Sequence, residues 1–188
     1  MAVGRATKRR RGLTTVAGRL AGKVVIVTGG GAGVGRGVAT RCASEGAAVV
    51  VAEVDSTLGA DTARIIAEHG GRAIFAHTDV TNEDSAATCV ATAETTFGPV
   101  TGLVNVAGIY PRATLDDTSV ALWDRIMAVN LKGPFLMCRA AVPSMRKAGG
   151  GSIVNVTSTN AYSGWPNLFA YSTSKGGLLT MKIGRAHV

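Results

Sequence analysis

The sequence predicts an α/β fold, a doubly wound parallel sheet with helices on both faces and therefore three layers (α/β/α). Short apolar runs alternate along the chain with longer segments of helical periodicity. The apolar runs are continuous, as expected for strands that are buried on both faces. A glycine-rich turn follows the first run and opens the first helical segment.

We expect five strands and at least five helices. The expected strands span 23–28, 47–53, 72–77, 101–106 and 152–157. The expected helices span 33–45, 57–69, 82–97 and 119–147, and a fifth begins near residue 168. Asn82 is expected to cap the third helix, and Gly133-Pro134 to interrupt the fourth. Because crossovers between parallel strands are right-handed, the expected sheet order is 3-2-1-4-5.

Length and composition indicate one domain. The chain has 188 residues, and its 46% hydrophobic content is enough for a large core. No apolar run reaches the roughly 18 residues of a membrane span, so no membrane partner is expected. The start of the chain also lacks the order of a secretion signal. The cysteines are odd in number and far apart, which favours a reducing cytoplasm, and the scattered histidines predict no metal site.

The net charge of +8 comes mainly from the first 19 residues, which hold six cations and no acid. Such a tail could contact nucleic acid or acidic lipid. No aromatic platform or groove-reading helix accompanies it. We therefore expect no nucleic-acid partner, and interpret residues 1–19 as a disordered extension or the product of a start codon assigned too early.

The turn after the first strand reads T-G-G-G-A-G-V-G over residues 28–35. Small residues let the backbone approach a pyrophosphate, and the N-terminus of the following helix supplies donors. The spacing is neither G-x-G-x-x-G nor a P-loop, since Arg36-Gly37 occupies the Lys-Ser/Thr positions. A plain tight turn is the alternative. The expected cofactor contacts here are Thr28, Gly29, Gly31, Gly33, Val34 and Gly35.

Two acids follow the second and third strands. Glu53 is placed to accept hydrogen bonds from the hydroxyls of an adenosine ribose and to repel a 2′-phosphate. It could instead be a solvated strand-end acid, and Asp55 competes with it for the role. Asp79 and Val80 stand where an adenine ring would lie, although Asp79 could also cap a helix.

Small residues close the fourth strand, where Asn105, Ala107 and Gly108 are expected beside a nicotinamide ribose. Asn130 is a polar residue on an apolar helical turn. It could be a kink residue bonded to backbone, or its carbonyl could anchor a water for proton relay.

Tyr171 and Lys175 are four residues apart on the expected last helix, so both side chains can share one face. A phenol with a pKa near 10 is a poor proton donor or acceptor at neutral pH, and a nearby ammonium can lower that value. Ser158, which lies 13 residues before Tyr171, is the third residue of this candidate catalytic group.

These residues together resemble the short-chain dehydrogenase/reductase family, in its compact single-domain branch with a Rossmann-like fold. Residues 20–182 carry the resemblance. The T-G-x-x-x-G-x-G motif matches residues 28–35, and N-N-A-G matches residues 105–108 except for Val106 in place of the second Asn. This departure puts in doubt one hydrogen bond that braces the central sheet. The extended epimerase/dehydratase branch spaces its glycines differently.

The resemblance implies an oxidoreductase that transfers a hydride between NAD, rather than NADP, and a small carbonyl or secondary alcohol. It implies that Tyr171 exchanges the proton and that Lys175 lowers its pKa and holds the ribose. Ser158 would polarise the substrate oxygen, and Asn130 would be the catalytic asparagine. A homo-oligomer, dimer or tetramer, is also expected. A cofactor-sensing regulator of the same fold is the alternative.

In this family a substrate loop and two further strands follow the Tyr/Lys helix. We therefore expect the chain to correspond to the first two-thirds of an enzyme and to be inactive by itself. Residues 183–188 match the translation of a widely used DNA-sequencing adapter and are expected to be foreign to the natural protein. Residues 109–111 and 160–169 are expected to line a partly apolar substrate site.

Overall fold

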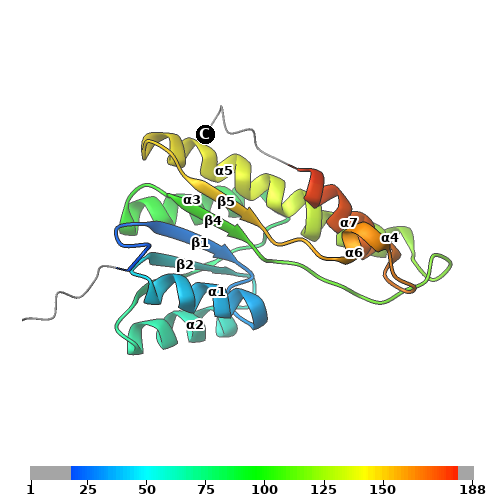
Figure 1. The fold of residues 1–188 in the computed structure, drawn as a ribbon, viewed down its shortest axis with the longest axis horizontal. Coiled ribbons are helices and arrows are strands. Elements are labelled where there is room, and N and C mark those ends of the chain that lie inside the picture. Colours follow the sequence, from blue (N-terminus) through cyan, green and yellow to red (C-terminus); the bar gives the residue numbers. More distant parts are fainter. Residues whose placement is uncertain (1–17, 182–188) are drawn as a thin grey trace, which may run out of the picture.

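A computed structural model of the protein describes residues 18–181. Most of the predicted basic extension 1–19 and the whole of the predicted foreign tail 183–188 lie outside this range. Five parallel strands form one sheet in the order β3-β2-β1-β4-β5, which confirms the predicted order (Figure 1). The strands are β1 (Val24–Thr28), β2 (Ala48–Glu53), β3 (Arg72–His77), β4 (Gly102–Asn105) and β5 (Ser152–Asn155).

Helices cover both faces of the sheet. On one face α1 (Gly33–Ser44) and α2 (Ser56–Glu68) pack on alternate residues of β1 and β2, including Val25 and Val49. On the other face α3 (Glu83–Phe97) and α5 (Gly133–Lys147) pack on the intervening residues, including Ile26 and Val50. Every residue of β1 is therefore buried, which explains its continuous apolar run.

The helical stretch expected over 119–147 does not break at Gly133-Pro134. It runs from α4 (Val120–Met127) through the π-helical turn η1 (Ala128–Lys132) directly into α5. Pro134 is tolerated because it stands in the first turn of α5, where a missing N–H costs little. The departure from α-helical geometry falls one turn earlier, around Asn130.

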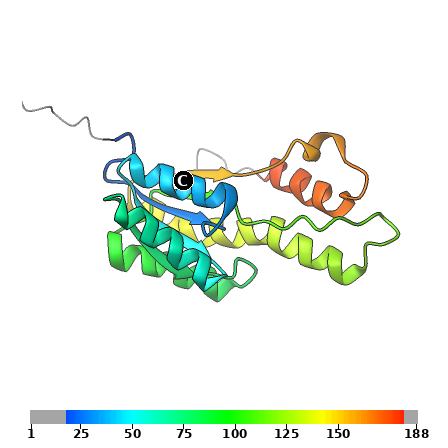
Figure 2. The same cartoon turned by 90° about the horizontal axis from the view of Figure 1, so that it is seen from below.

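A separate lobe extends beyond the carboxyl ends of the strands (Figures 1 and 2). It contains α4, a short helix α6 (Asn160–Ser163) that the sequence did not predict, and α7 (Phe169–Thr180). Helix α7 packs against α4, α6 and η1. The lobe thus places α7 opposite the glycine turn that follows β1.

Asn82 caps α3, its Oδ1 accepting from the Ser85 amide at 2.9 Å, which confirms that prediction. Within residues 18–181, no helix combines the length and apolar character needed to cross a membrane.

Candidate active site

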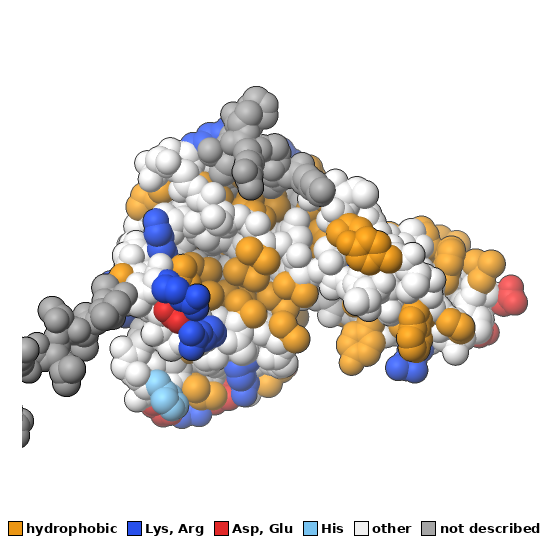
Figure 3. All heavy atoms as spheres, in the orientation of Figure 1, with side chains coloured by type: hydrophobic (Ala, Val, Ile, Leu, Met, Phe, Trp, Pro, Cys, Tyr) orange, Lys and Arg blue, Asp and Glu red, His pale blue; other side chains and the backbone are white. Residues whose placement is uncertain are grey.

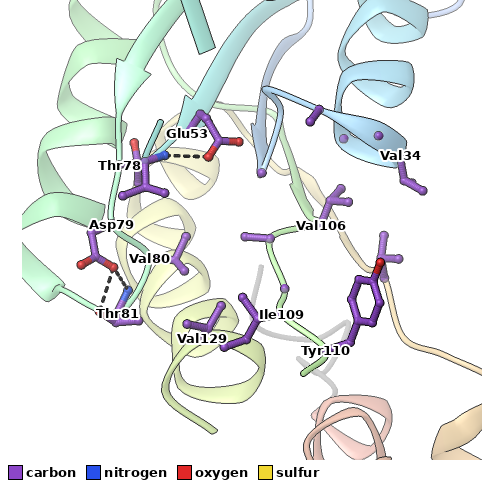
Figure 4. A pocket seen from close by; sticks show the side chains of 18 of the residues that line it. Val34, Glu53, Thr78, Asp79, Val80, Thr81, Val106, Ile109, Tyr110 and Val129 are labelled. Atoms are coloured by element: carbon purple, nitrogen blue, oxygen red, sulfur yellow. Dashed lines mark hydrogen bonds between the residues drawn. The ribbon is translucent and has the colours of Figure 1, made fainter. Parts of the chain in front are cut away.

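One pocket of about 920 Å³ lies at the carboxyl ends of the strands. The glycine turn and the residues after β2 and β3 form one side, and the loop after β4 with α7 forms the other. Figure 4 shows Glu53, Thr78 and Asp79 across the pocket from Val106 and Tyr110. A space this large, framed by a glycine turn and a helix N-terminus, suits a dinucleotide.

Backbone atoms leave no room for a side chain at Gly29 or Gly35 of the glycine turn, whereas Gly33 is open. A Cβ at Gly29 would lie 2.8 Å from the Ala107 Cα, and one at Gly35 would lie 1.9 Å from the Gly29 carbonyl oxygen. Gly33 has φ +50° and faces open space. Ala32, the N-cap of α1, offers no side-chain acceptor to the first-turn amides. Those amides therefore suit an anionic group bound in the pocket.

Glu53 ends β2 on the pocket wall. Its Oε2 accepts from the Gly31 amide at 3.0 Å, and its Oε1 accepts from the Val54 amide at 2.9 Å. Asp55, the competing acid, instead caps α2 by accepting from the Leu58 amide at 3.0 Å, and it does not line the pocket. Glu53 therefore lies on the pocket wall, whereas Asp55 does not.

Asp79 and Val80 both line the pocket. Asp79 does not cap α3. Its Oδ1 closes a local turn by accepting from the amide and the hydroxyl of Thr81, at 2.9 and 2.7 Å. The helix-capping interpretation of Asp79 is wrong because Asn82, three residues later, already holds that position.

Three of the expected cofactor contacts, Thr28, Gly31 and Asn105, stand behind the pocket wall rather than on it. The Thr28 hydroxyl accepts from the amides of Val106 and Ala107, at 3.0 and 3.2 Å. Asn105 is buried and donates through Nδ2 to the Asn155 Oδ1 at 2.9 Å. The Thr28 hydroxyl thus links β1 to the main chain that follows β4, at the place where the family motif has a second Asn and this chain has Val106.

Asn130 also supports the wall without lining the pocket. Its Oδ1 accepts from the Ile109 amide and its Nδ2 donates to the Ile109 carbonyl, both at 2.8 Å. Nδ2 also lies 3.0 Å from the Ser174 hydroxyl on α7. One buried amide therefore ties the loop after β4 to the helix that carries Tyr171 and Lys175.

Tyr171 and Lys175 both line the pocket, as the i, i+4 spacing predicts. Lys175 is 4% exposed, and its Nζ donates to the Val156 carbonyl at 2.8 Å. Nζ lies 5.9 Å from the centre of the Tyr171 ring. Burial lowers the pKa of the Lys175 ammonium below its ordinary value. Tyr110 stands edge-on to Tyr171, with ring centres 6.3 Å apart.

Ser158 lies just outside the pocket wall, two residues after Val156, which does line it. Its Oγ accepts from the Asn160 amide at 3.2 Å, which leaves the hydroxyl proton for another acceptor. Of the residues 109–111 and 160–169 expected to line a substrate site, Ile109 and Tyr110 line the pocket, whereas Pro111 and residues 160–169 do not. Sequence reasoning missed Thr78, Arg125 and Thr157, all of which line it. Thr157 directly precedes Ser158, so its position carried a signal, whereas Arg125 lies on α4 and carried none.

The profile described as short chain dehydrogenase matches residues 23–186 of this sequence. The chain belongs to the short-chain dehydrogenase family. Members of this family use nicotinamide cofactors. The match covers the glycine turn, the residues after β2 and β3, the β4 loop and α7, all of which line the pocket.

Several relatives are similar over most of the chain. An uncharacterized oxidoreductase of Thermotoga maritima is 42% identical over 158 residues, 84% of this chain and 62% of the relative. A cyclopentanol dehydrogenase of Comamonas sp. is 42% identical over 161 residues, 86% of this chain and 64% of the relative. An NADP-dependent (R)-specific alcohol dehydrogenase of Lentilactobacillus kefiri is 38% identical over 171 residues, 89% of this chain and 67% of the relative.

A crystal structure described as a short-chain alcohol dehydrogenase from Sinorhizobium meliloti 1021 superposes with a TM-score of 0.82. It is 37% identical, and the match covers 85% of this chain and 64% of that one. The chain thus spans slightly less than two thirds of the length of these proteins.

Proposed function

We propose that the protein is an oxidoreductase that transfers a hydride between a nicotinamide cofactor and a small carbonyl or secondary alcohol. One observation carries the proposal: a single pocket holds the glycine turn and Glu53 at one side and Tyr171 with Lys175 at the other. The relatives named above are alcohol dehydrogenases or oxidoreductases by their descriptions. The cofactor, when bound, would supply or accept the hydride at its nicotinamide ring.

The pocket residues fit such a cofactor. The open space at Gly33 and the uncapped N-terminus of α1 suit a pyrophosphate. Glu53 suits the hydroxyls of the adenosine ribose, and Val80 offers an apolar surface to a ring. Apolar side chains also gather on the lobe of α4, α6 and α7 (Figure 3).

Tyr171 would exchange the proton with the substrate oxygen, giving it up in reduction and taking it back in oxidation. Ser158 would donate its hydroxyl proton to the same oxygen as a hydrogen bond and stabilise the charge that develops there. Asn130 would hold the Ile109 loop and α7 in register, so that Tyr171 stays at a fixed place in the pocket.

Lys175 is the one cation buried beside Tyr171 among residues 18–181. Its positive charge would stabilise the negative charge that develops on the substrate oxygen and the Tyr171 oxygen while the proton passes between them. The hydrogen bond from Nζ to the Val156 carbonyl, at 2.8 Å, fixes the position of the ammonium group in the pocket. Nζ would also donate to the hydroxyls of the nicotinamide ribose.

We further propose that NAD is preferred over NADP. The Glu53 carboxylate would repel a 2′-phosphate, and neighbouring Ala32 and Val54 carry no cation to attract one. Fluorescence titration of the chain with NADH and NADPH tests both proposals. Tighter binding of NADH, with the preference lost in Glu53→Gln, is expected. Binding of neither cofactor would refute the proposed function, and tighter binding of NADPH would refute the preference alone.

Residues 20–182 are proposed to form the cofactor-binding domain. A cytoplasmic location is proposed because Cys42, Cys89 and Cys138 are free thiols.

A homo-oligomer is proposed because Phe135 on α5 is 49% exposed next to other apolar side chains of α4 and η1. Light scattering after gel filtration measures the oligomeric state, and a monomer at all concentrations would contradict this proposal.

A further inference from the structure

Arg36, on the first turn of α1, joins the glycine turn to α2. Its Nε lies 2.9 Å from both the Gly31 carbonyl oxygen and the Thr62 hydroxyl. Its Nη2 lies 3.2 Å from the Asp61 Oδ2. A guanidinium presents five N–H donors in a rigid plane, so one side chain can serve a carbonyl and a carboxylate together. Thr62, which is fully buried, also donates to the Gly31 carbonyl at 3.2 Å.

The backbone amide of Gly31 also has a hydrogen-bond partner. It donates to the Glu53 Oε2 at 3.0 Å. A Cβ at Gly31 would lie 2.8 Å from the Glu53 Cγ and 2.9 Å from the Leu58 Cβ. Gly31 is therefore clamped between Arg36 and Thr62 on one side and Glu53 on the other. A continuous set of contacts runs from Asp61, at the surface of α2, to the carboxylate on the pocket wall.

We propose that Arg36 is a positioning residue for the cofactor. It does not line the pocket, so it acts through Gly31 and Glu53 rather than by touching a ligand. By fixing the Gly31 carbonyl it holds the glycine turn and the Glu53 carboxylate in the arrangement that receives the pyrophosphate and the adenosine ribose. This inference rests on the proposed function.

A glycine-rich turn has many accessible backbone conformations, so a turn that is already fixed loses less entropy when a ligand binds. Removing Arg36 frees the Gly31 carbonyl from its charged donor and leaves only the Thr62 hydroxyl on it. The cost should fall on the adenosine half of the cofactor, because that half meets Glu53 and the turn. Binding of ADP-ribose should therefore weaken as much as binding of NADH.

The chain offers a matched control in Arg64. Its Nη2 also pairs with Asp61, at 2.6 Å, and its Nη1 with Glu68, but it makes no contact with Gly31. Arg36→Met and Arg64→Met thus remove the same charge and an ion pair to the same carboxylate. Only the first also removes the donor to the glycine turn.

The test measures the Kd of NADH and of ADP-ribose for the 188-residue chain and both variants, at about 0.05 M and about 0.5 M salt. Hydrogen exchange of the Gly31 amide is measured on the same proteins without ligand. Arg36→Met should weaken both ligands by about tenfold at either salt concentration, whereas Arg64→Met should stay within about twofold of the original. The Gly31 amide should exchange faster in Arg36→Met alone.

Unchanged affinity and unchanged exchange in Arg36→Met would overturn the inference. So would a loss of affinity that disappears at high salt, because the arginine would then act as a charge and not through the turn. If the original chain binds neither NADH nor ADP-ribose, the proposed function fails and the inference falls with it. If the original chain and Arg36→Met bind NADH equally well, the inference is refuted and the proposed function is not.

Discussion

A single methyl group at Gly35 tests how closely α1 packs on the glycine turn. The Cβ of Gly35→Ala would lie 1.9 Å from the Gly29 carbonyl oxygen and 2.7 Å from its carbon. Both partners are backbone atoms, so no side chain can rotate away, and the turn must shift by about 1 Å to restore an ordinary contact. Such a shift would disturb the hydrogen bond from the Gly31 amide to Glu53.

Overpacking of this kind costs about 3 kcal/mol when the neighbours cannot relax. For a chain of this length, that loss lowers Tm by about 6–12 °C. Gly37→Ala is the matched control, since Gly37 lies on the same helix and its Cβ would meet nothing within 4 Å. It should raise stability by about 0.5–1 kcal/mol, because alanine favours the helix.

Thermal unfolding followed by circular dichroism measures both variants, and NADH titration measures the effect on the pocket. We expect Gly35→Ala to lose stability and cofactor affinity together, and Gly37→Ala to lose neither. Equal Tm values for the two variants would show that the turn is not packed on α1 as described.

Three further predictions concern α7 and its supports. Asn130→Ala should destabilise the fold by about 3 kcal/mol in urea unfolding, since it leaves both backbone groups of Ile109 without their partner; a loss below about 1 kcal/mol would contradict this. Because burial lowers the pKa of Lys175 below 10.5, the unfolded state binds more protons between the two pKa values, and stability rises with pH there. Lys175→Met should lose that rise in unfolding series up to pH 10.5, and an unchanged slope would refute the assignment. In a chain that carries this sequence and extends to the length of the relatives, Ser158→Ala should lower kcat more than it raises KM, because its hydrogen bond strengthens as charge develops on the substrate oxygen; a change confined to KM would reverse that interpretation.

The sheet was predictable because each strand is a continuous apolar run and crossovers between parallel strands have one hand. Tyr171 and Lys175 were predictable as neighbours because helical spacing alone puts them on one face. The glycine-rich sequence indicated the turn after β1. The structure explains why glycine is needed at Gly29 and Gly35: a Cβ at either position would clash with backbone atoms.

Other features depend on contacts between segments far apart in the sequence. The sequence offered Asn130 as a kink residue bonded to backbone, and the π-helical turn at residues 128–132 agrees with that alternative. It could not show that the backbone partner is Ile109, 21 residues away. Three residues of the sequence motifs lie behind the pocket wall and do not line it: Thr28, Gly31 and Asn105. Which motif residues face the pocket depends on how the strands pack together, and the motif itself does not contain that information. The contacts of Arg36 could not be predicted from the sequence, because its partners Asp61 and Thr62 lie on another helix.

The central claim is that Tyr171 exchanges a proton with a substrate beside a bound nicotinamide cofactor. The most direct measurement is kcat for Tyr171→Phe, in a chain that carries this sequence and extends to the length of the relatives, together with the Kd of NADH. Phenylalanine keeps the ring and removes only the hydroxyl. The account predicts that kcat falls by about a hundredfold or more while the Kd of NADH stays within about twofold. A variant that retains about a tenth or more of the original kcat would contradict it.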